Sequence, residues 1–236
     1  MSVQSTREAS VRVRDNLVWP SAVRRVLSST ILEDYASERL LFQRGKHLAV
    51  EGAPNPYVYF HLTGWASAEC VSARGDRVLM DFITAGDFFG LAQETGDAAF
   101  TVTAMSDLVV LRFERDQLFE LIDTDDRVRA TCFQSMQTSL TRVRNMRVAV
   151  SAKSGVSKVC QLLSDLGERV IALSDSTLGA VVRPRIPISQ VALANAIGLT
   201  PVAVNRIVKN LRQAGLVDWD VAGLSILDLR RLRAFA

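Results

Sequence analysis

The chain is poor in the residues that most enzymes use for acid–base and metal chemistry. It has 2 histidines and 3 cysteines in 236 residues, and Cys70, Cys132 and Cys160 form no CxxC pair. This spacing indicates neither a zinc site nor a four-cysteine iron–sulfur cluster. The motifs GxGxxG, GxxxxGK[ST], HExxH, GxSxG and SxxK are also missing. We therefore expect no enzyme, no metal and no resident cofactor.

Long apolar runs are missing as well. No segment reaches the roughly 18 uninterrupted apolar residues at which a membrane helix is expected. The first residues, MSVQSTREASVRVRDN, lack the apolar core of a signal peptide. We therefore expect a cytoplasmic protein with no membrane partner. Hydrophobic residues make up 48% of the chain, which is enough for the cores of one large or two modest globular domains.

Charge is unevenly divided along the chain. The whole chain has a formal net charge of +3, but residues 1–150 contain 17 basic and 19 acidic residues, whereas residues 151–236 contain 11 basic and 6 acidic residues. The basic excess of the second part, a net charge of +5 against −2 in the first, favours a polyanionic partner there. A solvated basic surface would give the same excess, so the charge distribution alone does not identify the partner.

The segment ISQVALANAIGLTPVAVNRIVKNLRQAG at residues 188–215 predicts two short helices joined by a glycine turn. Ser189 is suited to cap the first helix, and Gly198 to turn the chain sharply. Thr200 can cap the second helix, with Pro201 in its first turn. At about 100° per residue, this helix gathers apolar residues on one side and a polar, cationic set on the other.

The next segment, LVDWDVAGLSIL, predicts a β-hairpin that turns at Ala222–Gly223. Two helices joined by a turn of about three residues and followed by a hairpin are typical of a winged helix-turn-helix, whose second helix enters the major groove of double-stranded DNA. An amphipathic helical hairpin in an unrelated core would share the periodicity. The short turn and the hairpin favour the DNA-binding interpretation.

The region from Leu40 to Phe113 has a different pattern, because short apolar runs alternate with a glycine about every ten residues. This pattern predicts an antiparallel β barrel or roll. In the strand YVYFHLTG, Val58, Phe60 and Leu62 should share one face, and Tyr57, Tyr59 and His61 the other. A hairpin is expected at Arg74–Gly75–Asp76, a short helix at FFGLAQE (residues 88–94), and two strands in TVTAMSDLVVLRFE.

A long helix is predicted from about Asp125 to Ser151. Its apolar residues recur at spacings of three, four or seven, which produces a narrow stripe suited to pairing with a second helix. Packing against the chain's own roll is the alternative, but the helix is too long for the roll to cover. The predicted dimer seam consists of Val128, Cys132, Met136, Leu140, Val143 and Val150. An amphipathic helix from Lys153 to Arg169 and a small hairpin in residues 173–187 should follow.

The order of these parts resembles the Crp-Fnr family of bacterial transcription regulators. The resemblance extends from about Val26 to the C-terminus and depends most on Glu51-Gly52, Leu62-Thr63-Gly64, Gly86-Asp87-Phe88-Phe89-Gly90 and the helix-turn-helix. It implies an α+β fold in three parts. These are an N-terminal antiparallel β roll of the double-stranded β-helix (jelly-roll) type with a helical lead-in at residues 1–124, a dimerisation helix at residues 125–152 and a winged helix-turn-helix at residues 153–236.

The resemblance also implies a homodimer that binds a near-palindromic site on double-stranded DNA, with RNA polymerase as a further candidate partner. Arg206 matches the family's base-reading arginine, which can bind guanine O6 and N7 in a bidentate manner. Ser189 and Thr200 match phosphate contacts at helix starts. Lys209 is expected to contact phosphate or to lie just outside the interface.

Two positions depart from the family pattern, because Pro201 and Val202 replace an arginine and a glutamate. Val202 cannot accept a hydrogen bond from cytosine, although it can contact a thymine methyl group, and Asn205 can pair with adenine. We therefore expect base readout by Val202, Asn205 and Arg206, at an operator unlike the familiar ones.

The sensory roll departs further. The family's cyclic-nucleotide binders have a glutamate after the Phe-Gly pair and an arginine near the next strand, where this chain has Leu91 and Asp97–Phe100. A buried cyclic phosphate would lack a cation, so we expect no cyclic AMP binding of the usual kind. The effector is of unknown identity, and its expected region is Phe89, Gly90, Leu91, Ala98 and Ala99.

Three alternatives remain open at this point. One is a cyclic nucleotide held through other residues, and another is haem, for which His47 and His61 are the only candidate histidine ligands. The third is a protein that does not bind DNA, either a dimeric interaction module or the regulatory part of an enzyme.

Overall fold

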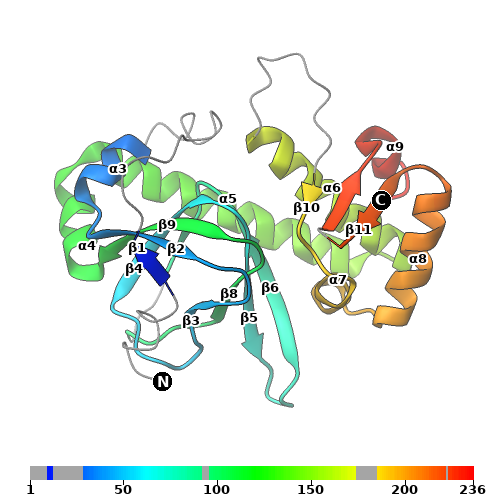
Figure 1. Cartoon of the computed structure of the whole chain (residues 1–236), viewed down its shortest axis with the longest axis horizontal. Helices are drawn as coiled ribbons and strands as arrows, with labels where there is room; N and C mark the ends of the chain where they lie inside the picture. The colour runs from blue at the N-terminus through cyan, green and yellow to red at the C-terminus, as the bar shows by residue number, and fades with distance from the viewer. Residues whose placement is uncertain (1–9, 13–28, 92–95, 174–184, 222) are drawn as a thin grey trace. The chain divides into compact units, whose positions relative to one another are not determined.

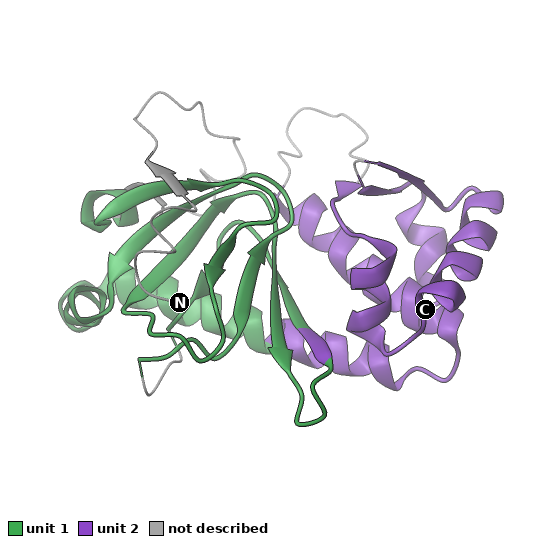
Figure 2. Ribbon diagram, turned by 60° about the horizontal axis from the view of Figure 1, so that its bottom comes forward, with its two compact units in different colours: residues 1–76, 80–140 green, residues 77–79, 141–236 purple. Residues whose placement is uncertain are grey.

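The structure, a computed structural model, describes residues 10–12, 29–91, 96–173, 185–221 and 223–236 (Figure 1). It divides into two compact units (Figure 2). Unit 1 comprises residues up to 76 and residues 80–140, and unit 2 comprises residues 77–79 and 141–236. The boundary falls within the long helix α5 (Asp126–Ser151), which is continuous from one unit to the other.

Unit 1 contains the β roll, built from two sheets of antiparallel strand pairs. The first sheet has the strand order β1-β2-β9-β4-β7, and the second has the order β3-β8-β5-β6. The strands are β1 (Ser10–Arg12), β2 (Glu38–Phe42), β3 (His47–Ala49), β4 (Tyr57–Thr63), β5 (Ala66–Val71), β6 (Arg77–Ile83), β7 (Phe88–Phe89), β8 (Thr101–Ala104) and β9 (Leu108–Glu114). The helices in the described part of this unit are α3 (Ser29–Tyr35), α4 (Arg115–Thr124) and the first part of α5.

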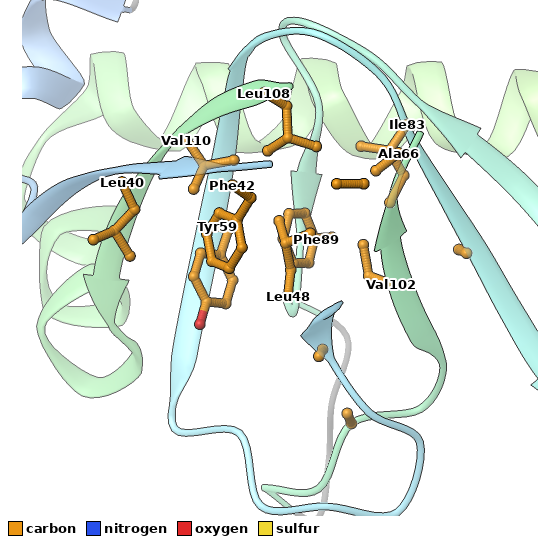
Figure 3. Packing of buried hydrophobic residues seen from close by; sticks show 14 residues of the cluster. Leu40, Phe42, Leu48, Tyr59, Ala66, Ile83, Phe89, Val102, Leu108 and Val110 are labelled. Atoms are coloured by element: carbon orange, nitrogen blue, oxygen red, sulfur yellow. The ribbon is translucent and has the colours of Figure 1, made fainter. Parts of the chain in front are cut away.

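Strand β4 shows how the sequence pattern builds two cores. Val58, Phe60 and Leu62 point to one face and pack with Leu118 of α4 and Val128 of α5, whereas Tyr59 points to the other face. The expected alternation is therefore confirmed, but both faces are buried. Tyr59 belongs to the interior of the roll, where Figure 3 shows it beside Phe42 and Phe89.

The segment after Asp87 differs from the expectation of a short helix. Phe88 and Phe89 form the strand β7, which pairs with Phe60 and Tyr59 of β4. Aromatic residues favour strands, and each of these two rings is buried in a different core. Gly90 then leaves the extended conformation at a φ of 92°, where an added Cβ would lie 2.8 Å from the carbonyl oxygen of Tyr57. Residues 92–94 lie outside the described residues.

Unit 2 contains the rest of α5 and a small three-stranded sheet surrounded by helices. Its elements are α6 (Gly155–Leu173), β10 (Arg185–Ile186), α7 (Gln190–Ile197), α8 (Pro201–Gln213), β11 (Val217–Asp220), β12 (Gly223–Ile226) and α9 (Leu229–Arg233). The sheet order is β10-β12-β11. Asp220 pairs with Gly223, which confirms the expected hairpin, but Gly223 is the first residue of β12 and not part of the turn as expected. Most of the hairpin expected at residues 173–187 lies outside the described residues.

Within the described ranges, no single helix is long and apolar enough to cross a membrane.

Candidate DNA-binding interface

Helices α7 and α8 each begin after a residue suited to cap a helix, and α7 ends at a glycine. Ser189 caps α7, and its Oγ accepts a hydrogen bond from the Ala192 amide at 3.1 Å. Gly198 ends α7 in the left-handed conformation at a φ of 64°, which costs glycine little. Thr200 caps α8 by accepting from the Ala203 amide at 3.2 Å. As a result, α7 and α8 are bent by 110° relative to one another.

Helix α8 has one buried side and one open side. The buried side consists of Val204, Ile207, Val208 and Leu211, which pack α8 against the rest of unit 2. The three predicted base readers and Lys209 are all exposed, and Val202 is 80% exposed. The predicted reading residues therefore lie together on the solvent side of one helix, as a helix that enters the major groove requires.

The capping hydroxyls keep a donor for phosphate. Because Ser189 and Thr200 use their oxygens as acceptors within the protein, each O–H proton remains able to point outward. Both residues are exposed at the start of a helix, where the free amides and the helix dipole favour an anion.

One contact of the reading surface was not anticipated from the sequence. The Asn205 Nδ2 donates a hydrogen bond to the Oε1 of Gln190 at 2.9 Å. Gln190 is the first residue of α7, fifteen positions earlier in the chain, so only the bend between the helices brings the two amides together. The bond orients Asn205 before any ligand arrives and leaves its Oδ1 free to accept.

The cations of unit 2 are of two kinds. Arg212 pairs with Asp218 of β11 at 3.1 Å, Arg185 with Asp220, and Arg233 with Glu168. By contrast, neither Arg206 nor Lys209 has an ion-pair or hydrogen-bond partner in the described part of the chain. The two unpaired cations on the open side of α8 are those that the sequence assigns to DNA.

The expected effector region is divided between different environments. Phe89 stacks on Tyr59 at a centroid distance of 4.8 Å and, with Ala98, belongs to the interior core (Figure 3). Leu91 packs in the other core, and Ala99 is exposed. Four of the five expected residues therefore lie in three different environments.

The side chain of Arg115, from helix α4, reaches the expected effector region at Gly90. The Arg115 Nη2 donates to the carbonyl oxygen of Gly90 at 2.7 Å, and the Arg115 amide donates to the carbonyl oxygen of Pro56. Arg115 is the first residue of α4 and is far in sequence from Gly90. Because 25 residues separate Arg115 from Gly90, the sequence around the Phe-Gly pair does not indicate this contact.

Helix α5 has two apolar faces, and the predicted seam mixed them. Val128 and Cys132 are buried in the core that α5 shares with β4 and β9, so these two residues are not available to a partner. Their assignment to the seam was wrong, because the first turns of α5 cover the roll. Met136, Leu140, Val143 and Val150 are exposed, as is Phe133, which the sequence analysis omitted.

The exposed residues of α5 follow a strict heptad. Positions 133, 136, 140, 143, 147 and 150 alternate in steps of three and four, and all are exposed. Leu140 is 70% exposed and Phe133 is 60% exposed. Residues at this spacing form one straight stripe, as found along the contact of two paired helices.

Burial makes two of the three cysteines unreactive. It raises the pKa of the Cys132 and Cys160 thiols to about 11. Since the thiolate is the reactive form, these side chains behave as small apolar groups at neutral pH. Cys70 is half-buried.

A β roll, a long helix with an exposed heptad stripe and a winged helix-turn-helix together indicate a DNA-binding regulator. The model of the cyclic nucleotide-binding domain matches residues 39–125, and the model of the Crp-like helix-turn-helix domain matches residues 157–235. The chain belongs to the Crp/Fnr family, whose members are transcription regulators rather than enzymes.

Individual relatives agree with this assignment. The nitrogen fixation regulation protein FixK of Bradyrhizobium diazoefficiens is 25% identical over 224 residues, which cover 94% of this chain and 92% of FixK. The transcriptional activator protein FnrL of Cereibacter sphaeroides is 24% identical over 75% of this chain and 71% of its own. The structure of FixK2 from Bradyrhizobium japonicum has a TM-score of 0.69, is 21% identical and covers 84% of this chain and 96% of FixK2, so the fold is shared.

Proposed function

We propose that the protein is a homodimer that binds a near-palindromic operator through α8 and regulates transcription there. In this proposal Arg206 and Asn205 read bases, Val202 contacts a thymine methyl group, and Ser189, Thr200 and Lys209 contact phosphates. It acts in the cytoplasm, on the chromosome, and RNA polymerase is its further partner. The observation that supports it best is the open side of α8, where Arg206 and Lys209 are exposed and unpaired among the described residues.

The dimer in this proposal forms along the heptad stripe of α5. Phe133, Met136, Leu140, Val143 and Val150 are apolar and exposed, and an unpaired stripe of this length would leave a large apolar surface in water. A second copy presents the same stripe. When the two helices pair about a two-fold axis parallel to them, each stripe buries the other.

The role of Arg206 can be tested with the protein alone. Operator DNA is first selected from random duplexes by the full-length protein, and affinity for the selected site is then measured by fluorescence anisotropy. We expect Arg206→Ala to weaken binding about 5- to 150-fold, or about 1–3 kcal/mol, and to relax the base preference at one position of each half-site.

Lys209→Ala is the matched control, because it removes a neighbouring cation from the same face. It should weaken binding to all sequences by a similar factor and reduce the slope of log affinity against log salt by about 1. An Arg206→Ala variant that binds the selected site within about twofold of the original protein would refute the bidentate arginine.

We also propose that the roll does not hold cyclic AMP in the family's usual way. Leu91 packs in the core that contains Leu118 of α4 and Val128 of α5. In the other core, Ala98 is buried among apolar side chains, and the Tyr59 and Phe89 rings are stacked. A buried cyclic phosphate there would lose its hydration, and the nearby Arg115 guanidinium already donates to the carbonyl oxygen of Gly90, so binding is unfavourable.

Thermal shift with cyclic nucleotides tests this proposal directly. A ligand that binds only the folded state raises the melting temperature, and at a concentration of 100 Kd it adds about 2.7 kcal/mol of stability. We expect no shift with millimolar cyclic AMP or cyclic GMP. A concentration-dependent rise with either nucleotide would favour the alternative, binding through residues other than the usual pair.

A further inference from the structure

Arg147 lies at a position of α5 where the heptad pattern predicts an apolar side chain. The stripe has apolar residues at 133, 136, 140, 143 and 150, and Arg147 stands between Val143 and Val150. Arg144 lies about one turn earlier and flanks the stripe. Both arginines are exposed, and neither has an ion-pair or hydrogen-bond partner among the residues that the structure describes.

Acidic residues are missing near the two arginines along the chain. Between Asp126 and Asp165 the sequence has no aspartate or glutamate at all. Asp126 pairs with Arg129. Asp165 lies against α5, where it accepts a hydrogen bond from Asn145 at 2.6 Å, but its ion-pair partner is Arg169. Neither Arg144 nor Arg147 has a carboxylate partner among the described residues, so the last turns of α5 present two unpaired positive charges.

A shallow depression lies at the same place, between the last turns of α5 and the start of α6 in unit 2. Its volume is about 430 Å³, and its lining residues are Arg144, Arg147, Val148, Ser151, Ala152 and Gln161. The two guanidiniums, the Ser151 hydroxyl and the Gln161 amide are all donors suited to oxygen atoms of an anion.

We propose that Arg144 and Arg147 of two copies form one anion site on the axis of the dimer, and that it takes a small ligand bearing a phosphate group. This inference depends on the α5 dimer proposed above. In a two-fold pair of parallel helices each seam residue faces its own copy, so Arg147 faces the second Arg147. Paired helices lie about 8–10 Å apart, within the combined reach of two arginine side chains.

Phosphate fits this arrangement better than a carboxylate or a chloride ion. Guanidinium groups bind phosphate oxygens through two parallel N–H donors, and a dianion can accept from both copies at once. Without an anion the facing arginines repel one another and weaken the dimer. Anion binding and dimerisation must therefore favour each other by the same factor, which would make the ligand a regulator of assembly.

Sedimentation of the full-length protein tests the proposal. The dimer dissociation constant is measured by dilution in sodium chloride and in sodium phosphate at the same pH and ionic strength. We expect phosphate to lower the constant by about tenfold, equal to about 1.4 kcal/mol. Arg147→Leu should dimerise more tightly than the original protein in chloride and should lose the phosphate response. Arg147→Gln, which keeps a polar side chain, should lose the response as well.

Lys153→Leu is the control, since it removes one exposed positive charge just beyond α5 but not from the depression. It should keep the full phosphate response. A dimer with the same constant in both buffers would overturn the anion site alone, whereas a monomer in both buffers would overturn the proposed dimer as well. A response seen with operator DNA but not with phosphate would also overturn the small-ligand proposal and would assign the arginines to the DNA backbone.

Discussion

His61 is a titratable side chain placed where its charged form is strongly disfavoured. It is fully buried in β4. Burial lowers the pKa of its imidazole from the usual 6.5 to about 4, although the backbone at Thr63 and Gly64 opposes part of this shift. The side chain is therefore neutral in the folded protein at physiological pH, which suits a packing role in the roll rather than a pH-sensing surface role.

We expect this histidine to make the roll sensitive to acid. The unfolded chain takes up a proton near pH 6.5 while the folded chain does not until about pH 4, so the stabilising contribution is complete above pH 6.5 and falls as the pH drops to 4. The full loss amounts to about 3 kcal/mol. Urea unfolding of the full chain at several pH values measures it.

The exposed His47 supplies the control for this measurement. His47→Gln should keep the acid sensitivity of the original protein between pH 6.5 and 4, whereas His61→Leu should reduce it. An unchanged pH profile for His61→Leu would contradict the assignment of a neutral, buried imidazole.

At the scale of elements, α5 divides its two faces between two tasks. The face with Val128 and Cys132 closes the core of the roll, and Ser135 on the same face accepts a hydrogen bond from the Phe88 amide at 2.9 Å. The opposite face carries the heptad stripe with Leu140. Substitutions on the two faces should therefore affect different properties, folding on one side and assembly on the other.

We expect Leu140→Lys to separate the subunits without unfolding them. Leu140 is 70% exposed in the single chain, so a lysine there costs the fold little, but in a dimer it would bury unpaired charge. The dimer dissociation constant should rise at least about tenfold by sedimentation.

The neighbouring Thr141→Lys adds the same side chain beside the stripe and should leave the constant nearly unchanged. Val128→Ala should do the reverse of Leu140→Lys, because it leaves a cavity in the core at a cost of about 2 kcal/mol of stability while the dimer persists. A Leu140→Lys protein that remains fully dimeric would rule out the proposed seam.

The same helix shows how far the sequence could be interpreted. Its position and length were predicted well, and so were the caps of α7 and α8, because these depend on residues within one turn. Which face points inward depends on the roll that α5 covers, and spacings of seven connect 128 to 135 as well as 136 to 143. Local periodicity therefore could not separate Val128 and Cys132 from the seam.

Contacts between distant segments were the least predictable features. The bond between Gln190 and Asn205 joins two helices, and the approach of Arg115 to Gly90 joins α4 to the end of β7. Each side chain by itself is an ordinary polar residue in the sequence. The first contact forms because α7 and α8 are bent relative to one another. The second forms because α4 packs on the roll.

At the scale of the whole molecule, a two-fold dimer with one reading helix per copy requires two half-sites about one turn of DNA apart. We expect five base pairs inserted between the half-sites, about half a helical turn, to place them on opposite sides of the duplex. Affinity measured by anisotropy should fall to that of a single half-site. The same insertion outside the operator should have no effect, and tolerance of the central insertion would contradict simultaneous binding by a symmetric pair.

The three surface ion pairs among the described residues of unit 2 bear on how the proposed dimer would find its operator. A chromosome offers a vast excess of other sequences, and affinity for them comes almost entirely from cations that neutralise phosphates. Because Arg185, Arg212 and Arg233 are matched with carboxylates, fewer cations are free to hold the protein on arbitrary DNA. We expect brief visits to random sequence, so that the search is rapid and long occupancy is reserved for sites that Arg206 and Asn205 can read.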